Sequence, residues 1–217
     1  YEKKLVKKAY LTPEEKFTII PWGVDIKKPH RQRPVTSNQS PITILCVGRL
    51  SKHKGQVWLL KQYVEIVQNL SKPTKLVFVG SDEKGEISNL KSQISNLKLE
   101  KKVIFAGEVS EGQLENWYQK ADLFAIFPEY EAFGLVFLEA MAHQIAVLTH
   151  KVGAIAEVLD NAAMLTDPYN AAQVKVALTK LIEDDKFRHE LGQKGYNYVR
   201  EKFSWQKTAE KFQEVFF

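Results

Sequence analysis

The sequence Glu131-Ala-Phe-Gly-Leu-Val-Phe-Leu-Glu-Ala-Met-Ala142 joins a turn to an apolar helix in the second half of the chain. It follows a short apolar run, Leu123 to Phe127, which has the length and composition of a buried strand. A strand, a turn with a glycine and then a helix is the repeating unit of a parallel α/β sheet. The rest of the chain continues this pattern in both directions.

Two carboxylates, Glu131 and Glu139, lie on either side of Gly134 in this unit. A helix rises about 1.5 Å per residue, so we expect roughly 10 Å between the two groups. The backbone N–H groups of the first helical turn lack partners and favour an anion. A hydrogen-bond acceptor, an anion site and a second hydrogen-bond acceptor in this order would fit a nucleotide sugar. The alternative is that Glu139 is an ordinary residue on a helix surface.

Short apolar runs alternate with amphipathic stretches from residue 17 onward. Several runs are apolar throughout, which is typical of strands covered on both faces. The alternation predicts an α/β fold with a Rossmann-like, doubly wound parallel sheet. The predicted strands are residues 17–20, 42–47, 76–79, 103–105, 123–127, 145–148 and 163–165.

Additional helices are predicted after the last strand. Apolar residues recur at helical spacing around 174–182 and 187–199, and Ser204 is a good N-cap for a last helix. The apolar face of that helix carries Trp205, Phe212 and Phe216, so we expect it to pack against another surface.

The composition is that of a globular protein with one large domain, or with one domain and an appendage. The chain has 217 residues, of which 44% are hydrophobic and 26% charged. A single cysteine, Cys46, excludes an internal disulfide and a Cys-rich zinc site. The net charge of +5 favours anionic partners and is compatible with an acceptor at a membrane surface. Without a basic run interleaved with aromatic residues, we expect no nucleic-acid partner. A single cysteine fits a reducing compartment, and we expect a cytoplasmic location, either free or peripheral at the inner membrane face.

Two cations follow the predicted strand at residues 42–47. Gly48 lets a ligand approach the backbone, and Arg49 and Lys54 would reach the crevice at the carboxyl ends of the strands. Two fixed positive charges suit a pyrophosphate. The loop is neither a Walker loop nor a dinucleotide-binding Gly-x-Gly-x-x-Gly. The alternative is a basic surface loop.

Glycines also end the next two predicted strands. Gly80 follows the run at 76–79, and Gly107 with Glu108 follows the run at 103–105. Each alone is more often a simple turn, but together with Gly48 they suggest one continuous floor for a crevice.

These residues resemble the donor-binding half of a GT-B glycosyltransferase, closest to the large retaining family 4, the glycosyl transferases group 1. The resemblance runs from about Ile42 to Phe217, and residues 20–25 resemble the join to the family's N-terminal domain. The glutamate pair in its context and the Arg/Lys pair in this order are specific signals. Further matching segments are 47–50, 54–55, 79–80, 105–107, 121–124, 131–142, 152–158 and 203–205.

The resemblance implies a role for each of these groups. Arg49 and Lys54 would hold the donor diphosphate and stabilise the leaving group, and Glu131 would meet the hydroxyls of the transferred sugar. Glu139 would bind the ribose hydroxyls. The reaction would retain the anomeric configuration and need neither a metal nor another cofactor, with the nucleotide-diphosphate sugar as substrate. The remaining donor-binding residues would be Gly48, Gly80, Gly107, Glu108, Phe133, Gly134, Leu135 and Val136.

The chain departs from the family pattern at a few positions. The glycine and proline usual after the motif helix are absent from residues 142–147, and the usual Gly-Gly pair is Gly153-Ala154. These changes touch neither the cations nor the glutamates, so we still expect the chain to bind a donor. The identity of the transferred sugar is left open.

We expect residues 1–40 to be the end of an N-terminal domain and an interdomain connection, and residues 41–217 to be the nucleotide-sugar-binding domain. The N-terminal acceptor domain would belong to the same chain or to another one. By itself the chain should bind the donor but transfer little or no sugar. The alternatives are a non-catalytic partner subunit that binds a nucleotide sugar, and a related GT-B epimerase.

Overall fold

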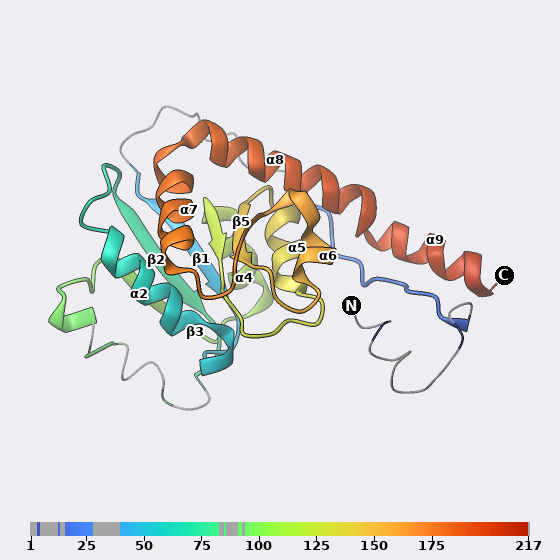
Figure 1. Ribbon diagram of the computed structural model, residues 1–217, viewed down its shortest axis with the longest axis horizontal. Helices are drawn as coiled ribbons and strands as arrows, with labels where there is room; N and C mark the ends of the chain where they lie inside the picture. Colours follow the sequence, from blue (N-terminus) through green and yellow to red (C-terminus); the bar gives the residue numbers. More distant parts are fainter. Residues whose placement is uncertain are drawn as a thin grey trace.

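The computed structural model describes residues 4, 13, 16–27, 40–82, 85, 91–92 and 94–216. Its centre is a sheet of six parallel strands, which Figure 1 shows beneath the helices. The strands are β1 (Ile42–Val47), β2 (Thr74–Val79), β3 (Val103–Gly107), β4 (Leu123–Ala125), β5 (Ala146–His150) and β6 (Met164–Thr166).

The order of the strands is β3-β2-β1-β4-β5-β6. The chain therefore winds outward from β1 to β3, returns to the centre, and winds outward again from β4 to β6. This confirms the predicted doubly wound sheet. In such a sheet the order reverses between the two central strands, here β1 and β4, and ligands bind outside the carboxyl ends at that point.

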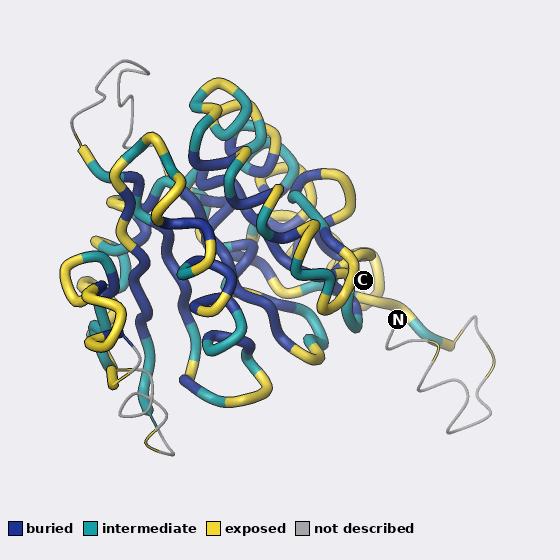
Figure 2. Tube along the Cα trace, turned by 60° about the vertical axis from the view of Figure 1, so that its left-hand side comes forward, coloured by how far each residue is buried: buried dark blue, intermediate teal, exposed yellow. Residues whose placement is uncertain are grey.

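The central strands are buried on both faces. Three of the six residues of β1 are less than 2% exposed, and β4 and β5 are buried throughout. Figure 2 shows the buried residues concentrated in the strands and the exposed ones in the outer loops. Continuous apolar runs predict such strands because each side chain meets a helix on one face or the other.

Helices cover both faces of the sheet. On one face, α2 (Gln56–Ile66) and α7 (Ala171–Glu183) pack side by side (Figure 1). Right-handed crossovers place α4 (Glu111–Lys120), α5 (Leu135–Ala142) and α6 (Ile155–Leu159) on the other face. The short helices η2 (Lys52–Lys54) and η3 (Asp160–Ala162) belong to the connections.

The helix α8 (Asp185–Lys202) crosses the sheet where β5 begins. Gly192 makes this contact close, since a Cβ atom there would lie 2.4 Å from the carbonyl oxygen of Gln144. The helix begins at Asp184, whose side chain accepts a hydrogen bond from the backbone N–H of Phe187.

The last helix, α9 (Trp205–Phe216), packs against residues 21–24 rather than against the sheet. The N–H of Val24 donates to the carbonyl of Phe203 at 2.8 Å, and the Thr208 hydroxyl donates to the carbonyl of Pro21 at 3.0 Å. The predicted N-cap is confirmed, because the Ser204 hydroxyl accepts from the N–H of Lys207. Much of its apolar surface is uncovered, since Trp205, Phe212 and Phe216 are 48%, 48% and 67% exposed.

One predicted strand is wrong. Residues 17–20 lie outside the sheet, where Ile19 is 55% exposed. Isoleucine and phenylalanine favour strands, but Pro21 follows at once and no partner strand is adjacent among the residues that the structure describes. Within the end of an N-terminal domain and connection predicted at residues 1–40, residues 28–39 and most of residues 1–15 lie outside the described residues. None of the described helices is long and apolar enough to cross a membrane.

Candidate functional site

Three predicted glycines lie side by side at the carboxyl ends of β1, β2 and β3. The N–H of Gly48 donates to Val79 at 2.9 Å, and the N–H of Gly80 donates to Gly107 at 2.8 Å. A side chain at Gly80 would be impossible without movement, because its Cβ would lie 2.2 Å from the carbonyl oxygen of Gly48. The predicted continuity of this edge is therefore confirmed, while its role as a ligand floor stays a prediction.

A buried glutamine shapes the loop that carries the cations. Gln56, the first residue of α2, is 2% exposed, and its side-chain Nε2 donates to the carbonyl of Arg49 at 2.9 Å. Its Oε1 lies 3.5 Å from the N–H of Ser51 and accepts from it. The loop thus has a fixed backbone, and Arg49 itself is exposed at its outer side.

Lys54 and Glu131 form an ion pair across the crevice end of the sheet. The Nζ of Lys54 lies 2.8 Å from Oε2 of Glu131, and the side chains are 33% and 17% exposed. Seventy-seven residues separate them in the chain, so the pair links the loop after β1 to the turn after β4. The structure therefore brings together one predicted cation and one predicted carboxylate.

The same two segments touch along their backbones. Gly55 has a φ of 74°, and a Cβ atom there would lie 1.9 Å from the carbonyl oxygen of Phe127. The N–H of Glu129 donates to the carbonyl of His53 at 2.8 Å, and their side chains meet at 2.5 Å. The Lys54–Glu131 ion pair, the His53–Glu129 hydrogen bond and close backbone contact thus hold the basic loop against the acidic turn.

The turn that carries Glu131 rests on a second turn. A Cβ atom at Gly153, whose φ is 54°, would lie 2.2 Å from the carbonyl oxygen of Glu131. That carbonyl accepts a hydrogen bond from the N–H of Ala154 at 3.0 Å. Alanine in place of the second usual glycine is compatible with this contact, because it is Gly153 that meets Glu131.

The predicted anion site at the start of α5 has the expected backbone. Gly134 is the N-cap with a φ of 86°, and Leu135 and Val136 follow in the first turn, where N–H groups have no acceptor inside the helix. The side chain of Phe133 points elsewhere, since its ring packs edge-on against Phe203 at 5.9 Å. Leu135 is 40% exposed. Only the backbone of this turn therefore remains as a candidate donor to a ligand.

Glu139 is tied to α4 by a hydrogen bond. The hydroxyl of Tyr118 donates to Oε2 of Glu139 at 2.7 Å, and burial followed by the Glu139 charge raises the pKa of Tyr118 well above its usual value. His143 is the C-cap of the motif helix, with Nδ1 2.7 Å from the carbonyl oxygen of Glu139. Glu139 is partly exposed. It is therefore more than the ordinary surface residue of the alternative interpretation.

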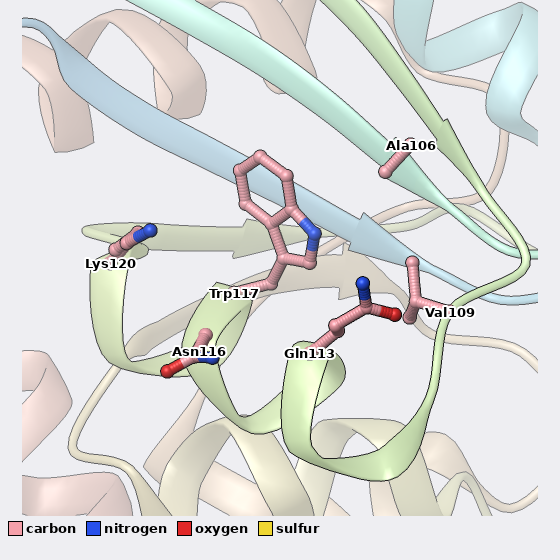
Figure 3. Close-up of a pocket in the computed structure, with 6 residues that line it drawn as sticks. All are labelled: Ala106, Val109, Gln113, Asn116, Trp117 and Lys120. Atoms are coloured by element: carbon pink, nitrogen blue, oxygen red, sulfur yellow. The ribbon is translucent and has the colours of Figure 1, made fainter.

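A cavity of about 340 Å³ lies between α4 and the end of β3, and Figure 3 shows Trp117 rising beside it. Two of its lining residues flank Gly107 and Glu108 in the chain, so it adjoins that edge of the predicted floor. Glu108 itself is exposed. The lining residues are Ala106, Val109, Gln113, Asn116, Trp117 and Lys120, and none of the predicted site residues is among them.

A buried histidine ends β5 on the other side of the site. His150 is fully buried, with Nδ1 3.0 Å from the Thr166 hydroxyl, and Nε2 accepts from the N–H of Tyr169 at 3.2 Å. The rings of Trp58 and Phe127 lie against it. Burial lowers the pKa of His150 to about 4, so the imidazole is neutral near pH 7.

Four residues of this region are not predicted from the sequence: Tyr118, Gln56, Glu129 and His150. The available signal for Tyr118 is that the hydroxyl of a buried tyrosine needs a partner. The signal for Gln56 is a glutamine directly before the apolar residues 57–60 at the start of the helix. The contacts of Glu129 and His150 depend on residues far away in the chain, and no local pattern indicates them.

Comparison with known proteins agrees with the fold. The family described as glycosyl transferases group 1 matches residues 27–198. Lipopolysaccharide 1,2-N-acetylglucosaminetransferase of Salmonella typhimurium is 33% identical over 180 residues, which are 79% of this chain and 47% of that protein. The chain spans about half the length of the curated relatives it matches.

Two solved structures illustrate the likeness. The C-terminal domain of a glycosyl transferase group 1 protein from Francisella tularensis is 29% identical with a TM-score of 0.69, over 76% of this chain and 87% of that one. The Anabaena protein Alr3699/HepE, solved with UDP and glucose, is 23% identical with a TM-score of 0.71, over 81% and 48%. The second of these likenesses shows the fold alone.

Proposed function

Since the chain belongs to the glycosyl transferases group 1 family, we propose that it holds the donor-binding site of an enzyme that moves a sugar from a nucleotide sugar to an acceptor. The observation that carries this proposal is the meeting of the loop 48–55 with the turn 127–134. They meet outside the carboxyl ends of β1 and β4, where the strand order reverses.

In this proposal the cations of the loop hold the diphosphate. Arg49 and Lys54 offset the charge that grows on the leaving nucleoside diphosphate, and preorganised charges of this kind supply large rate factors. The backbone N–H groups of Gly134, Leu135 and Val136 add donors at the positive end of α5. Two cations and a helix end neutralise the diphosphate, so we propose a metal-independent reaction.

The carboxylates bind the sugars at the two ends of the donor. Glu131 is beside Lys54, so a hexose attached to a diphosphate held by Lys54 would meet Glu131 first. Glu139 lies in the second turn of α5 and is assigned to the ribose. The glycine edge at Gly48, Gly80 and Gly107, with Glu108, borders the same donor. We propose that the configuration at the anomeric carbon is retained, as the family resemblance implies.

We further propose that residues 41–217 form the donor-binding domain and residues 1–40 connect it to an acceptor domain. The curated relatives are about twice as long as this chain, so half of each is unmatched. The uncovered apolar residues of α9, with Trp22 at 63% exposure, form a surface on which such a domain would pack. By itself the chain then binds the donor and transfers little sugar.

Calorimetry with UDP-, GDP- and ADP-sugars, with and without EDTA, tests the proposal. One nucleotide series should bind, EDTA should leave its affinity unchanged, and Arg49→Ala with Lys54→Ala should abolish binding. Lys61→Ala, an exposed lysine on α2, is the matched control and should bind like the wild type. Binding that survives the loss of both Arg49 and Lys54 would show that the site lies elsewhere.

A further inference from the structure

We propose that Tyr118 is a positioning residue that orients the Glu139 carboxylate toward ribose hydroxyls and so makes the site prefer ribonucleotides over 2′-deoxyribonucleotides. The inference rests on the proposed function, because it assigns Glu139 to the ribose. It adds Tyr118, a residue on the different helix α4. Tyr118 affects the ligand only through Glu139.

The hydrogen bond has the geometry of a fixed support. The Tyr118 hydroxyl lies 2.7 Å from Oε2 of Glu139, Tyr118 is 3% exposed, and Glu139 is partly exposed. A carboxylate has two oxygens, each able to accept, so a bond to Oε2 leaves Oε1 as an acceptor for a ligand. The bond is charge-assisted and therefore stronger than a bond between neutral groups.

The phenol ring cannot easily turn away from this position. It stacks on Phe124 at 6.3 Å between ring centres and on His143 at 4.9 Å. His143 is held in turn, with Nδ1 at the carbonyl oxygen of Glu139 and Nε2 3.0 Å from a carboxylate oxygen of Glu115. The direction of the hydroxyl is thus set by the fold before any ligand binds, which removes an ordering cost from binding.

Selectivity follows from the chemistry of the two sugars. Ribose can donate hydrogen bonds from both its 2′ and its 3′ hydroxyl to an oriented carboxylate, whereas 2′-deoxyribose offers one of them. A site built to accept a hydroxyl proton is left with an unpaired acceptor when that hydroxyl is missing. If Glu139 is free to rotate, this penalty shrinks, because the carboxylate can turn to water.

A hydrogen bond that only stabilises the fold would behave differently. Removing the Tyr118 hydroxyl would then lower the unfolding midpoint and leave the ratio of the two affinities unchanged. Tyr63 supplies the matched comparison, since it is fully buried and its hydroxyl lies 2.8 Å from the Thr74 hydroxyl, on the far side of the sheet from α4.

The experiment measures calorimetric affinities of the 217-residue chain for UDP, GDP and ADP, each beside its 2′-deoxy counterpart. For the nucleotide that binds, we expect the wild type to prefer the ribose form about ten-fold, the effect of one charge-assisted hydrogen bond. Tyr118→Phe should bring this preference below about three-fold by weakening the ribose form alone, and Tyr63→Phe should keep it. Thermal unfolding reports whether each variant is folded.

A second variant keeps the inference falsifiable if Tyr118→Phe does not fold. Glu139→Gln, at a partly exposed position, should lose the same preference, and in the double variant the two losses should not add. An unchanged preference in folded Tyr118→Phe or in Glu139→Gln overturns the inference, as does a wild type without preference. A wild type that binds none of the three nucleotides overturns the proposed function, and this inference with it.

Discussion

The Lys54–Glu131 ion pair poses a question at the scale of single residues, because its two members are assigned to different parts of one ligand. Oε2 of Glu131 lies 2.8 Å from the Nζ of Lys54. In the proposed function Lys54 holds the diphosphate, which would compete with that carboxylate for the same cation. The ion pair would therefore keep both side chains in place and lower the affinity for the phosphates.

We predict that Glu131→Gln binds the free nucleoside diphosphate more tightly, by about three- to ten-fold, and the nucleotide sugar no more tightly than the wild type. Loss of the carboxylate frees Lys54 and removes repulsion of the phosphates, at about 1 kcal/mol for a partly exposed pair. Calorimetry with both ligands measures this. Glu129→Gln, whose carboxylate pairs with His53 instead, is the control. Weaker binding of the diphosphate by Glu131→Gln would contradict the competition.

His150 makes a second prediction at this scale, on the pH dependence of stability. Its pKa is about 4 in the fold against 6.5 for a free side chain, so the unfolded chain binds a proton between these values and the folded chain does not. The contribution of His150 to the free energy of unfolding is then complete above pH 6.5 and is lost as the pH falls toward 4. We expect a loss of about 2 kcal/mol between pH 7 and pH 5 from this group.

Urea unfolding at pH 7 and pH 5 checks this, with His150→Gln as the variant. The variant should be less stable at pH 7, because it disturbs the bonds to Thr166 and Tyr169. The free energy of unfolding of the variant should change less between pH 7 and pH 5 than that of the wild type, by about the same 2 kcal/mol. Equal pH dependence in wild type and His150→Gln would refute the assignment.

At the scale of elements, the strands were predictable where both faces are buried. The run Ile42–Val47 matches β1 from end to end, because Pro41 and Gly48 bound six apolar or small residues that suit a buried strand. Residues 17–20 have the same local character and form no strand, since a strand also needs a neighbour. The predicted end of β4 was two residues too long, because Phe127 turns away to meet Gly55.

The candidate site also has contacts that the sequence could predict and contacts that it could not. Motifs placed Lys54 and Glu131 at strand ends, and the parallel sheet brings such ends to one edge, so their meeting followed from topology. Tyr118 and Glu139 are on different helices, and the bond between them depends on how α4 and α5 pack. Helical periodicity identifies the buried face of α4, but it does not state which polar atom a buried hydroxyl will reach.

The contact between the loop after β1 and the segment after β4 makes a prediction about elements. Gly55→Ala should destabilise the chain by about 3 kcal/mol or more, because a left-handed backbone costs about 1 kcal/mol and the Cβ would also displace Phe127. Gly107→Ala is the control, since its φ is 69° and nothing lies within 4 Å of a Cβ atom there. It should cost about 1 kcal/mol in urea unfolding. Equal losses in the two variants would mean that the two segments do not constrain each other.

At the scale of the whole molecule, the two faces of the sheet are covered by helices, whereas the apolar face of α9 is not covered by the described residues. The sheet is covered on both faces, yet α9 leaves Phe212 and Phe216 stacked on each other in solvent. Apolar residues are exposed singly on most proteins, whereas a cluster marks a contact surface. The residues 21–24 that hold α9 are the same ones that resemble the junction of two domains. The uncovered face and the proposed acceptor domain thus belong to one side of the molecule.

We therefore predict that this chain self-associates weakly at high concentration through α9, and that Phe212→Ser with Phe216→Ser abolishes the association. Both side chains are at least 48% exposed, so the double variant should unfold within about 0.5 kcal/mol of the wild type and bind the nucleotide equally well. Sedimentation velocity over a range of concentrations measures the association. Val176→Ser, which removes an isolated apolar side chain of 69% exposure on α7, should leave it unchanged. If the double variant instead loses stability or nucleotide affinity, α9 is part of the donor domain's own core, and the acceptor domain must pack on another face.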